Sequence, residues 1–281
     1  MSRRDTRRDA AQFAYLFLLL SRLYDQYQRL PIQPGQLVTV VAVALICIHL
    51  FPDLVPFETT DVCISSRAMF RLLSESQDTY FALLFGRRSA LAFDRWSEAT
   101  RRLTLSTLLH VDDLHLYYNT AALIWKGSML EDRMGTARFC FFLGYSILAS
   151  GTLAVLLGRL AESLELGTLS CAVGFSGVLY AMSAVAYMEP QTNEMTLVQS
   201  TFVVRRRHAI WLDVVLSSVL HRHVSFLGHL GGALAGWAWC ALPRGTWSAL
   251  FSSRGRSTRF HGGGRVGGSG NRALARFVAV D

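Results

Sequence analysis

One uncharged run, from Cys171 to Met188, constrains the fold of this chain more than any other segment. As a helix it is just long enough to cross a bilayer core of about 30 Å. It contains a serine, Ser176, with Gly174 and Gly177 close on either side. Glycine lets another backbone approach and leaves a neighbouring hydroxyl open to a substrate. The run therefore predicts a membrane-spanning helix that carries a candidate nucleophile.

The composition is typical of an integral membrane protein. Of the 281 residues, 51% are hydrophobic and 17% are charged, and the charges cluster between long apolar runs. The net charge of +8 comes mainly from arginines near predicted membrane boundaries. It indicates a topology signal and attraction to anionic lipids, and no nucleic-acid surface. The five cysteines give no disulfide scaffold, and the residues leave open whether Cys63 and Cys171 are bridged.

Six spans are expected, so the predicted fold class is an all-α, polytopic membrane helix bundle. The spans lie at about residues 36–51, 105–130, 139–157, 171–188, 208–220 and 224–242. An interfacial helix over 10–29 precedes them, and polar connections occupy 52–104, 131–138, 159–170 and 191–207. The expected organisation is a basic N-terminus at 1–34, a membrane domain at 35–242 and a disordered tail rich in Gly, Ser and Arg at 243–281.

Arginine placement sets the expected orientation. With six spans, both termini lie on one side, together with the 131–138 turn and the arginines at 205–207. Cytoplasmic connections are enriched in Lys and Arg, so we expect both termini in the cytoplasm. The long 52–104 connection falls on the opposite side despite its arginines, and long loops follow this rule least.

The fourth and sixth expected spans enter the membrane from the same, non-cytoplasmic side. Ser176 and His229 then lie about five residues in, roughly 8 Å deep at about 1.5 Å per residue. A serine hydroxyl is a weak nucleophile until a neighbouring base takes its proton. Gly232 and Gly236 are one turn apart and form a small-residue face for close helix packing. We therefore predict Ser176 as nucleophile and His229 as general base.

The second expected span adds polar groups near the same side. His115 and Asn119 are four residues apart and share one helix face. Both can donate hydrogen bonds to a developing oxyanion, along with the backbone N–H of Ser176. Tyr180, one turn after Ser176, would stack on His229 and orient the imidazole.

Four linked motifs resemble the rhomboid family of intramembrane serine proteases over about residues 100–242. They are His110 with His115-x-x-x-Asn119, Gly127-x-x-x-Glu131-x-x-x-Gly135, Gly174-x-Ser176-Gly177-x-x-Tyr180 and His229-x-x-Gly232-x-x-x-Gly236. The stretches 110–119, 125–127 and 171–179 are similar to the endoplasmic-reticulum subgroup, the rhomboid-domain-containing proteins. The resemblance implies a Ser176–His229 dyad, oxyanion stabilisation by His115 and Asn119, stacking by Tyr180, a structural Glu131 and a location in the endoplasmic reticulum membrane.

Two features depart from the family pattern. Arg101 and Arg102 stand where the family often has Trp-Arg, so the first-loop anchor lacks its Trp. The subgroup can carry a ubiquitin-interacting helix in its tail, but residues 243–281 contain no acidic, Ala- and Leu-rich helix. Ubiquitin recognition is therefore not expected.

The resulting hypothesis is a hydrolase that cleaves peptide bonds in or near transmembrane helices, with transmembrane proteins as substrates and membrane lipids as surroundings. It needs no cofactor and no metal. Because helical carbonyls are already hydrogen-bonded, a substrate helix must partly unwind before cleavage. Helix-breaking residues are therefore expected near the cut site.

Several alternatives stay open on the residues alone. Ser176 is also suited to a helix contact, His115 and Asn119 to interhelical hydrogen bonds, and His110, Asp112, Asp113 and His115 to a metal site. A catalytically inactive protein that binds membrane clients in quality control is the main rival function. A solute transporter fits less well, because no internal repeat is visible and the polar residues gather near one side. Asp213, in the fifth expected span, needs an inward partner, and its role is not assigned.

Overall fold

The computed structural model describes residues 3–54, 57, 59–74, 89–169, 171–188, 195–198, 202–220 and 225–242. Its helices are α1 (Arg3–Gln28), α2 (Gln36–Leu50), α3 (Thr59–Val62), α4 (Ser66–Ser74), α6 (Ser89–Leu108), α7 (Asp113–Ala122), α8 (Ser128–Met134), α9 (Thr136–Ser163), α10 (Ser176–Met188), α11 (Arg206–Leu220) and α12 (Phe226–Ala241). A 3₁₀ turn covers Pro52–Leu54, and a π-helical turn, Leu123–Gly127, joins α7 to α8. The predicted disordered tail lies outside the described residues.

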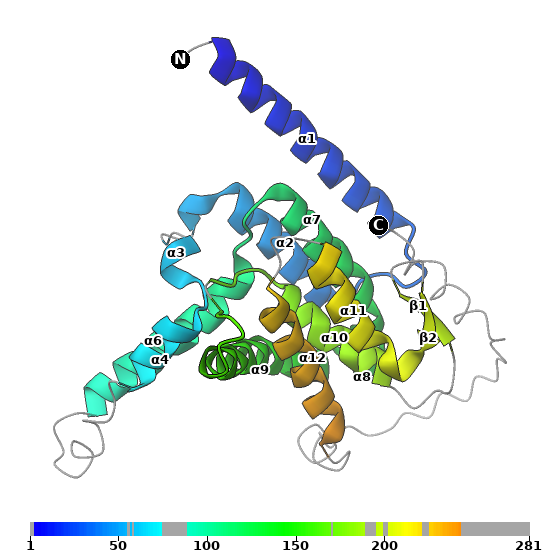
Figure 1. The fold of residues 1–281 in the computed structure, drawn as a ribbon. Helices are drawn as coiled ribbons and strands as arrows, with labels where there is room; N and C mark the ends of the chain where they lie inside the picture. Colours follow the sequence, from blue (N-terminus) through cyan, green and yellow to red (C-terminus); the bar gives the residue numbers. More distant parts are fainter. Residues whose placement is uncertain are drawn as a thin grey trace.

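Three helices, α9, α10 and α12, form the centre of the bundle, and the other helices surround them (Figure 1). Apolar side chains of this centre are almost completely buried, among them Phe139, Phe142, Val178 and Met182. Trp239 of α12 packs edge-on against Phe142 of α9, with ring centroids 4.9 Å apart. The bundle centre therefore joins helices that are far apart in the sequence.

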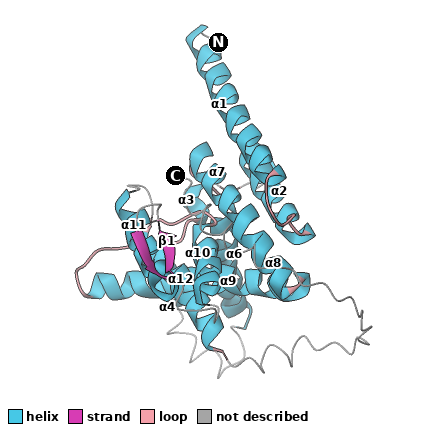
Figure 2. Cartoon of the chain, turned by 90° about the vertical axis from the view of Figure 1, so that its right-hand side faces the viewer, coloured by secondary structure: helices cyan, strands magenta, loops and turns pink. Residues whose placement is uncertain are grey.

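Two peripheral parts extend from this centre. Helix α1 projects away from the bundle over most of its length (Figure 2). It is held at its C-terminal end, where Leu23 is buried and the Gln26 side-chain amide donates to the Ala121 carbonyl at 3.4 Å. Helices α4 and α6 run side by side away from the opposite part of the bundle (Figure 1).

The described chain is mostly helical, which agrees with the all-α prediction, but it also contains a β-hairpin. Strands β1 (Met195–Val198) and β2 (Phe202–Arg205) pair antiparallel, with Met195 opposite Arg205. The sequence predicts only a polar loop here. The hairpin residues are rich in Val, Phe and Thr, whose side chains fit a strand well.

The lengths and hydropathies of the described helices can be compared with those that a membrane span needs. Helix α9 is long and apolar enough to cross a membrane, whereas α2, α10 and the stretch His208–Val219 are apolar but shorter. The count of six spans therefore stays a prediction. The N-terminal helix is present as expected and is longer than residues 10–29.

The prediction of one continuous helix over residues 105–130 is wrong. Helix α6 ends at Leu108, and α7 starts at Asp113. Between them Asp112 is extended, with φ −151° and ψ 169°, and its carboxylate accepts the backbone N–H of His115 at 2.7 Å. An aspartate in this position caps a new helix. The apolar residues on both sides of Asp112 predict one span, and apolar character alone does not show that Asp112 caps a new helix.

Candidate active site

A non-helical segment, residues 171–175, leads to Ser176 at the first position of α10. Within it, the N–H of Gly174 donates to the carbonyl of Ser106 on α6 at 2.7 Å. Gly174 has φ +109°, a conformation that glycine adopts without strain. The expectation that the fourth span is helical from residue 171 is therefore wrong. Ser176 lies at a helix N-terminus, where the first N–H groups have no partner within the helix.

A disulfide bond ties this segment to the first long connection. Cys63 and Cys171 are bonded across 108 residues of sequence. Next to them, Ile64 and Ala172 exchange two backbone hydrogen bonds, of 3.0 and 2.8 Å. The bridge that the sequence left open is thus present, and a covalent bond and a short backbone pair together fix the approach to Ser176.

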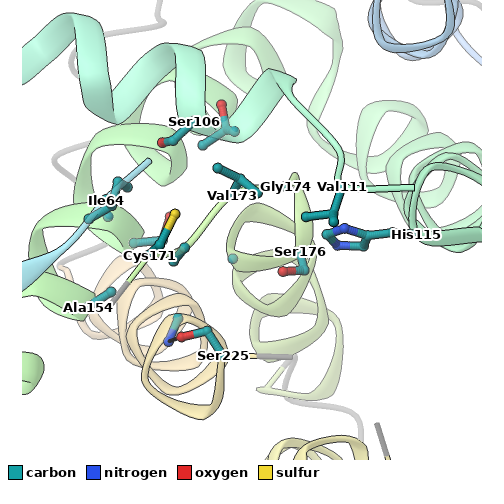
Figure 3. Close-up of a pocket in the computed structure, with 16 residues that line it drawn as sticks. Ile64, Ser106, Val111, His115, Ala154, Cys171, Val173, Gly174, Ser176 and Ser225 are labelled. Carbon is teal, nitrogen blue, oxygen red and sulfur yellow. Dashed lines mark hydrogen bonds between the residues drawn. The ribbon is translucent and has the colours of Figure 1, made fainter. Parts of the chain in front are cut away.

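A small cavity of about 90 Å³ opens beside Ser176. Figure 3 shows the Ser176 side chain and the His115 ring next to each other in this cavity. Its other walls come from the end of α6, from α9, from the starts of α10 and α12 and from residues 171–174. Many of the lining residues are small: Ser150, Gly151, Ala154, Ala172, Gly177, Ser225 and Gly228. The volume admits a few water molecules or one small side chain.

Glycines bring α12 directly against α10. A Cβ atom added at Gly232 would overlap with the carbonyl oxygen of Gly177, and one added at Gly236 would overlap with that of Ala181. A Cβ atom added at Gly177 would lie 3.6 Å from the carbonyl oxygen of Gly228. The first turns of the two helices therefore touch, at the residues that follow Ser176 and precede His229.

His229 is the fourth residue of α12 and is 5% exposed. The ring of Tyr180 stacks on its imidazole, with centroids 4.1 Å apart and an interplanar angle of 26°. Tyr180 is one turn after Ser176 on α10. The structure thus brings Ser176, Tyr180 and His229 to one helix–helix contact, although His229 itself does not line the cavity.

Ser217, on α11, is a polar residue of this contact that the sequence analysis missed. Its Oγ accepts a hydrogen bond from the Tyr180 hydroxyl at 2.6 Å and lies 3.3 Å from Nδ1 of His229. A usable signal was present, because Ser217 is one turn after Asp213. Two polar residues on one face of an apolar helix indicate the side that faces the protein interior.

His115 and Asn119 are placed differently from each other. The His115 ring lies against Gly174, where an added Cβ atom would come within 2.6 Å of its Cε1. Asn119 is 4% exposed and does not line the cavity, and its side-chain amide donates to the carbonyl of His115 at 2.7 Å. The structure therefore brings His115, and not Asn119, next to Ser176.

The metal alternative involved His110 and its neighbours. His110 is buried and meets His115 edge to face, with ring centroids 5.2 Å apart. Within the described ranges, no three His, Cys, Asp or Glu side chains form a group that could hold a metal ion. Asp113 instead contacts His49 at the end of α2, with 2.8 Å between Oδ1 and Nε2.

Glu131, on α8, is buried against the N-terminus of α2. Its carboxylate accepts the backbone N–H groups of Leu37 at 3.3 Å and Val38 at 3.0 Å, and the hydroxyl of Thr136 at 2.9 Å. The N-cap residue of α2, Gly35, has no side chain to cap the helix. Glu131 therefore supplies from α8 the acceptors that α2 lacks locally, which supports the structural role implied by the resemblance.

Arg101 and Arg102 form ion pairs within α6, and Arg101 also contacts Phe57 earlier in the first long connection. Their side chains bond the two oxygens of Glu98, each at 2.7 Å, and the Arg101 guanidinium lies 4.4 Å above the Phe57 ring. Burial raises the pKa of the Glu98 carboxyl, but its hydrogen bonds to Arg102 and Arg101 and the charges of these arginines outweigh burial and hold the pKa below its ordinary value.

Asp213 acts electrostatically on Lys126. Lys126, in the π-helical turn, donates from Nζ to Ser183 Oγ at 2.7 Å and is acted on by the charge of Asp213. Neither Lys126 nor Asp213 lines the cavity at Ser176. The charge that the sequence left without a role therefore acts on a polar contact between the π-helical turn and α10.

The sequence is similar to known proteins over the part of the chain that forms this site. The family model described as "Rhomboid domain" matches residues 97–244. Rhomboid-related protein 4 of Homo sapiens is 37% identical over 139 residues, which is 48% of this chain and 44% of that protein. Rhomboid-like protein 14, mitochondrial, of Arabidopsis thaliana is 34% identical over 192 residues, which is 59% of this chain and 57% of that protein. The chain thus spans about half the length of these relatives.

Proposed function

This chain belongs to the rhomboid family, and on that premise we propose that it is an intramembrane serine endopeptidase that cleaves transmembrane helices of other membrane proteins. Membership makes it an integral membrane protein. The observation that carries the proposal is the contact between α10 and α12, where Tyr180, one turn after Ser176, stacks on His229 at 4.1 Å. Acyl transfer needs at least a nucleophile and a neighbouring base. Here a serine and a histidine lie on two helices that pack closely through glycines.

In this mechanism Ser176 Oγ attacks the scissile carbonyl while His229 takes the hydroxyl proton. His229 then gives the proton to the leaving amine, and the bond between the carbonyl carbon and the amine nitrogen breaks. Water next hydrolyses the acyl-enzyme, with His229 again acting as base. No cofactor takes part in these steps.

The oxyanion that forms on the carbonyl needs hydrogen-bond donors. His115 lines the cavity with Ser176, and Ser176 lies at the start of a helix, where backbone N–H groups point outward. Asn119 has one amide hydrogen engaged with the carbonyl of His115. Its assigned role requires the second amide hydrogen or a rotation of the side chain when substrate binds.

The cavity also bears on the substrate. A cavity of about 90 Å³ next to Ser176 fits a small side chain or a few water molecules. A helical substrate presents no free carbonyl, so we expect cleavage in a segment that contains small and helix-breaking residues. Ubiquitin is not a proposed partner.

For location we propose the endoplasmic reticulum membrane, with both termini in the cytoplasm. The Cys63–Cys171 disulfide supports an oxidising compartment on the side of the cavity. The name of the Arabidopsis relative places that protein in the mitochondrion, so imaging of the tagged chain in cells against markers of both organelles decides between the two.

The test compares wild type with Ser176→Ala, both purified in detergent, on a single-span substrate with a helix-destabilised segment. We expect cleavage by wild type and at least a 1,000-fold loss (order of magnitude) in the variant, as in other serine hydrolases that lose the nucleophile. Covalent labelling of Ser176 by a fluorophosphonate probe gives a second readout. If wild type binds the substrate as tightly as the variant but neither cuts nor labels, the alternative function holds: a catalytically inactive client-binding protein in quality control.

A further inference from the structure

The hydroxyl of Ser217 lies where three groups converge. Besides its contacts with Tyr180 and His229, its Oγ–H donates to the carbonyl of Val214 at 3.2 Å. Ser217 and His229 are 7% and 5% exposed, so bulk water does not compete for these contacts. The three partners come from α10, α11 and α12, which makes Ser217 the meeting point of the helices around His229.

The protons can be assigned from the chemistry of these groups. A serine hydroxyl has one proton to donate and two lone pairs to accept with. The Ser217 proton has two acceptors in reach, the Val214 carbonyl at 3.2 Å and Nδ1 of His229 at 3.3 Å, and we assign it to the nearer one, the carbonyl. The phenol of Tyr180 donates to Oγ at 2.6 Å. With this assignment Oγ accepts from His229, and Nδ1, 3.3 Å away, is the donor.

We infer that Ser217 is a positioning residue, which holds His229 with its proton on Nδ1 and leaves Nε2 unprotonated to act as base. This inference rests on the proposed function. The hydrogen bond between Ser217 and His229 matters most during the reaction, because the imidazolium donates from both nitrogens and needs an acceptor at each. Ser217 Oγ is that acceptor at Nδ1, the place that an aspartate takes in a triad.

Two titratable groups are near this network. Tyr180 stacks on His229 from α10, and Asp213 lies one turn before Ser217 on α11. The charge of Asp213 acts on Tyr180. Because Asp213 acts on the residue that stacks on His229, it is kept in every variant below.

The variants separate the hydroxyl from the packing around it. Ser217→Ala removes Oγ, and Ser217→Thr restores it. Ser218→Ala is the matched control, because the Ser218 hydroxyl donates to the same Val214 carbonyl at 2.8 Å but belongs to the next face of the helix. We expect Ser217→Ala to lower kcat about 10- to 100-fold with KM unchanged, as for loss of a hydrogen bond to a charged group. Ser217→Thr should recover most of kcat, and Ser218→Ala should match wild type.

A direct readout of the tautomer does not depend on activity. Nitrogen-15 NMR of histidine-labelled protein in detergent, with His229→Asn as the difference reference, reports which ring nitrogen carries the proton. We expect Nδ1–H in wild type and a mixture of tautomers in Ser217→Ala. A wild-type signal with the proton on Nε2 overturns the inference, as does a Ser217→Ala enzyme with unchanged kcat and spectrum. If wild type does not cleave at all, the proposed function fails while the spectrum still decides the role of Ser217.

Discussion

The contact between α10 and α12 and the outer layer of α3, α4 and α6 are held together in opposite ways. At the first, backbones meet through Gly177, Gly232 and Gly236, and a Cβ atom added at Gly232 or Gly236 would overlap a backbone carbonyl. At the second, a side-chain contact and a covalent bond join separate segments: the Arg101 guanidinium lies 4.4 Å above the Phe57 ring, and Cys63 is bonded to Cys171. The contact that carries Ser176 and His229 is therefore closed by backbone atoms, whereas the glycines of α9 that face the outer layer, Gly151 and Gly158, meet side chains.

The largest effect is expected from filling the glycine contact. Gly232→Val places a side chain into the carbonyl of Gly177, which is backbone and cannot move without shifting α10. We expect about 3 kcal/mol or more of lost stability, at the upper end of overpacking costs, and no labelling of Ser176. Thermal unfolding in detergent and fluorophosphonate labelling measure the two effects.

Gly144→Ala is the control for this substitution. It lies in α9, and an added Cβ atom there meets nothing within 4 Å. Alanine also favours a helix over glycine by about 1 kcal/mol, so this variant should be as stable as wild type or slightly more so. Equal tolerance of Gly232→Val and Gly144→Ala would remove the contrast between the two regions.

The disulfide should have the next largest effect. Cys63→Ser removes a bond that closes a loop of 108 residues. We expect a loss of about 2 kcal/mol, at the low end of the usual range, because the Ile64–Ala172 backbone pair still joins the two segments. Unfolding with and without reductant measures it, and Cys63→Ser should no longer respond to reductant. A larger effect of reductant on the variant than on wild type would contradict this account.

Glu131 links the bundle to α2 and should rank third. Glu131→Gln keeps one acceptor oxygen but loses the charge that favours the N–H groups of Leu37 and Val38. We expect a loss of about 1 kcal/mol, as for removal of a helix cap. Asp132→Asn is the control, because Asp132 is the next residue and is exposed. Equal stability of the two variants would mean that Glu131 does not cap α2.

The smallest effect is expected at Glu98. Its pKa is lowered in the folded protein, where its bonds to Arg102 and Arg101 outweigh burial. A carboxyl of this kind stabilises the fold above its ordinary pKa and loses that contribution as the pH falls through the folded value. Glu98→Gln should cost less than about 1 kcal/mol at pH 7, and the difference from wild type should shrink below about pH 4. If the stability difference between wild type and Glu98→Gln grew as the pH fell, the ion pairs of Glu98 would not stabilise the fold.

The sequence predicted much of the candidate site but placed its parts imprecisely. Ser176, His229 and Tyr180 were chosen from spacing, and the structure gathers them at one helix contact. The same reasoning put Ser176 a few residues inside a helix, whereas it starts one. Hydrophobicity marks where a chain avoids water, and it does not mark where the backbone hydrogen bonds change from one partner to another.

Ser217 and Asn119 show the other limit. Ser217 lies twelve residues before His229 in the chain. The spacing of Asp213 and Ser217 indicates the inward face of α11, but it does not state that this face meets His229. Asn119 shares a helix face with His115, yet its amide turns back to the helix backbone. Side-chain direction depends on the partners that neighbouring helices offer, so spacing alone could not decide it.

By itself, the sequence determined the family, the mostly helical class and the polar residues that belong to the site, because motif spacing and composition are properties of the chain. Only the tertiary structure decided how these residues meet. The break at Asp112, the bond from Cys63 to Cys171 and the place of Ser217 beside His229 each join segments that are distant in sequence or depend on backbone conformation. Such contacts arise when helices pack in three dimensions, and their energies come from geometry that a linear pattern does not contain.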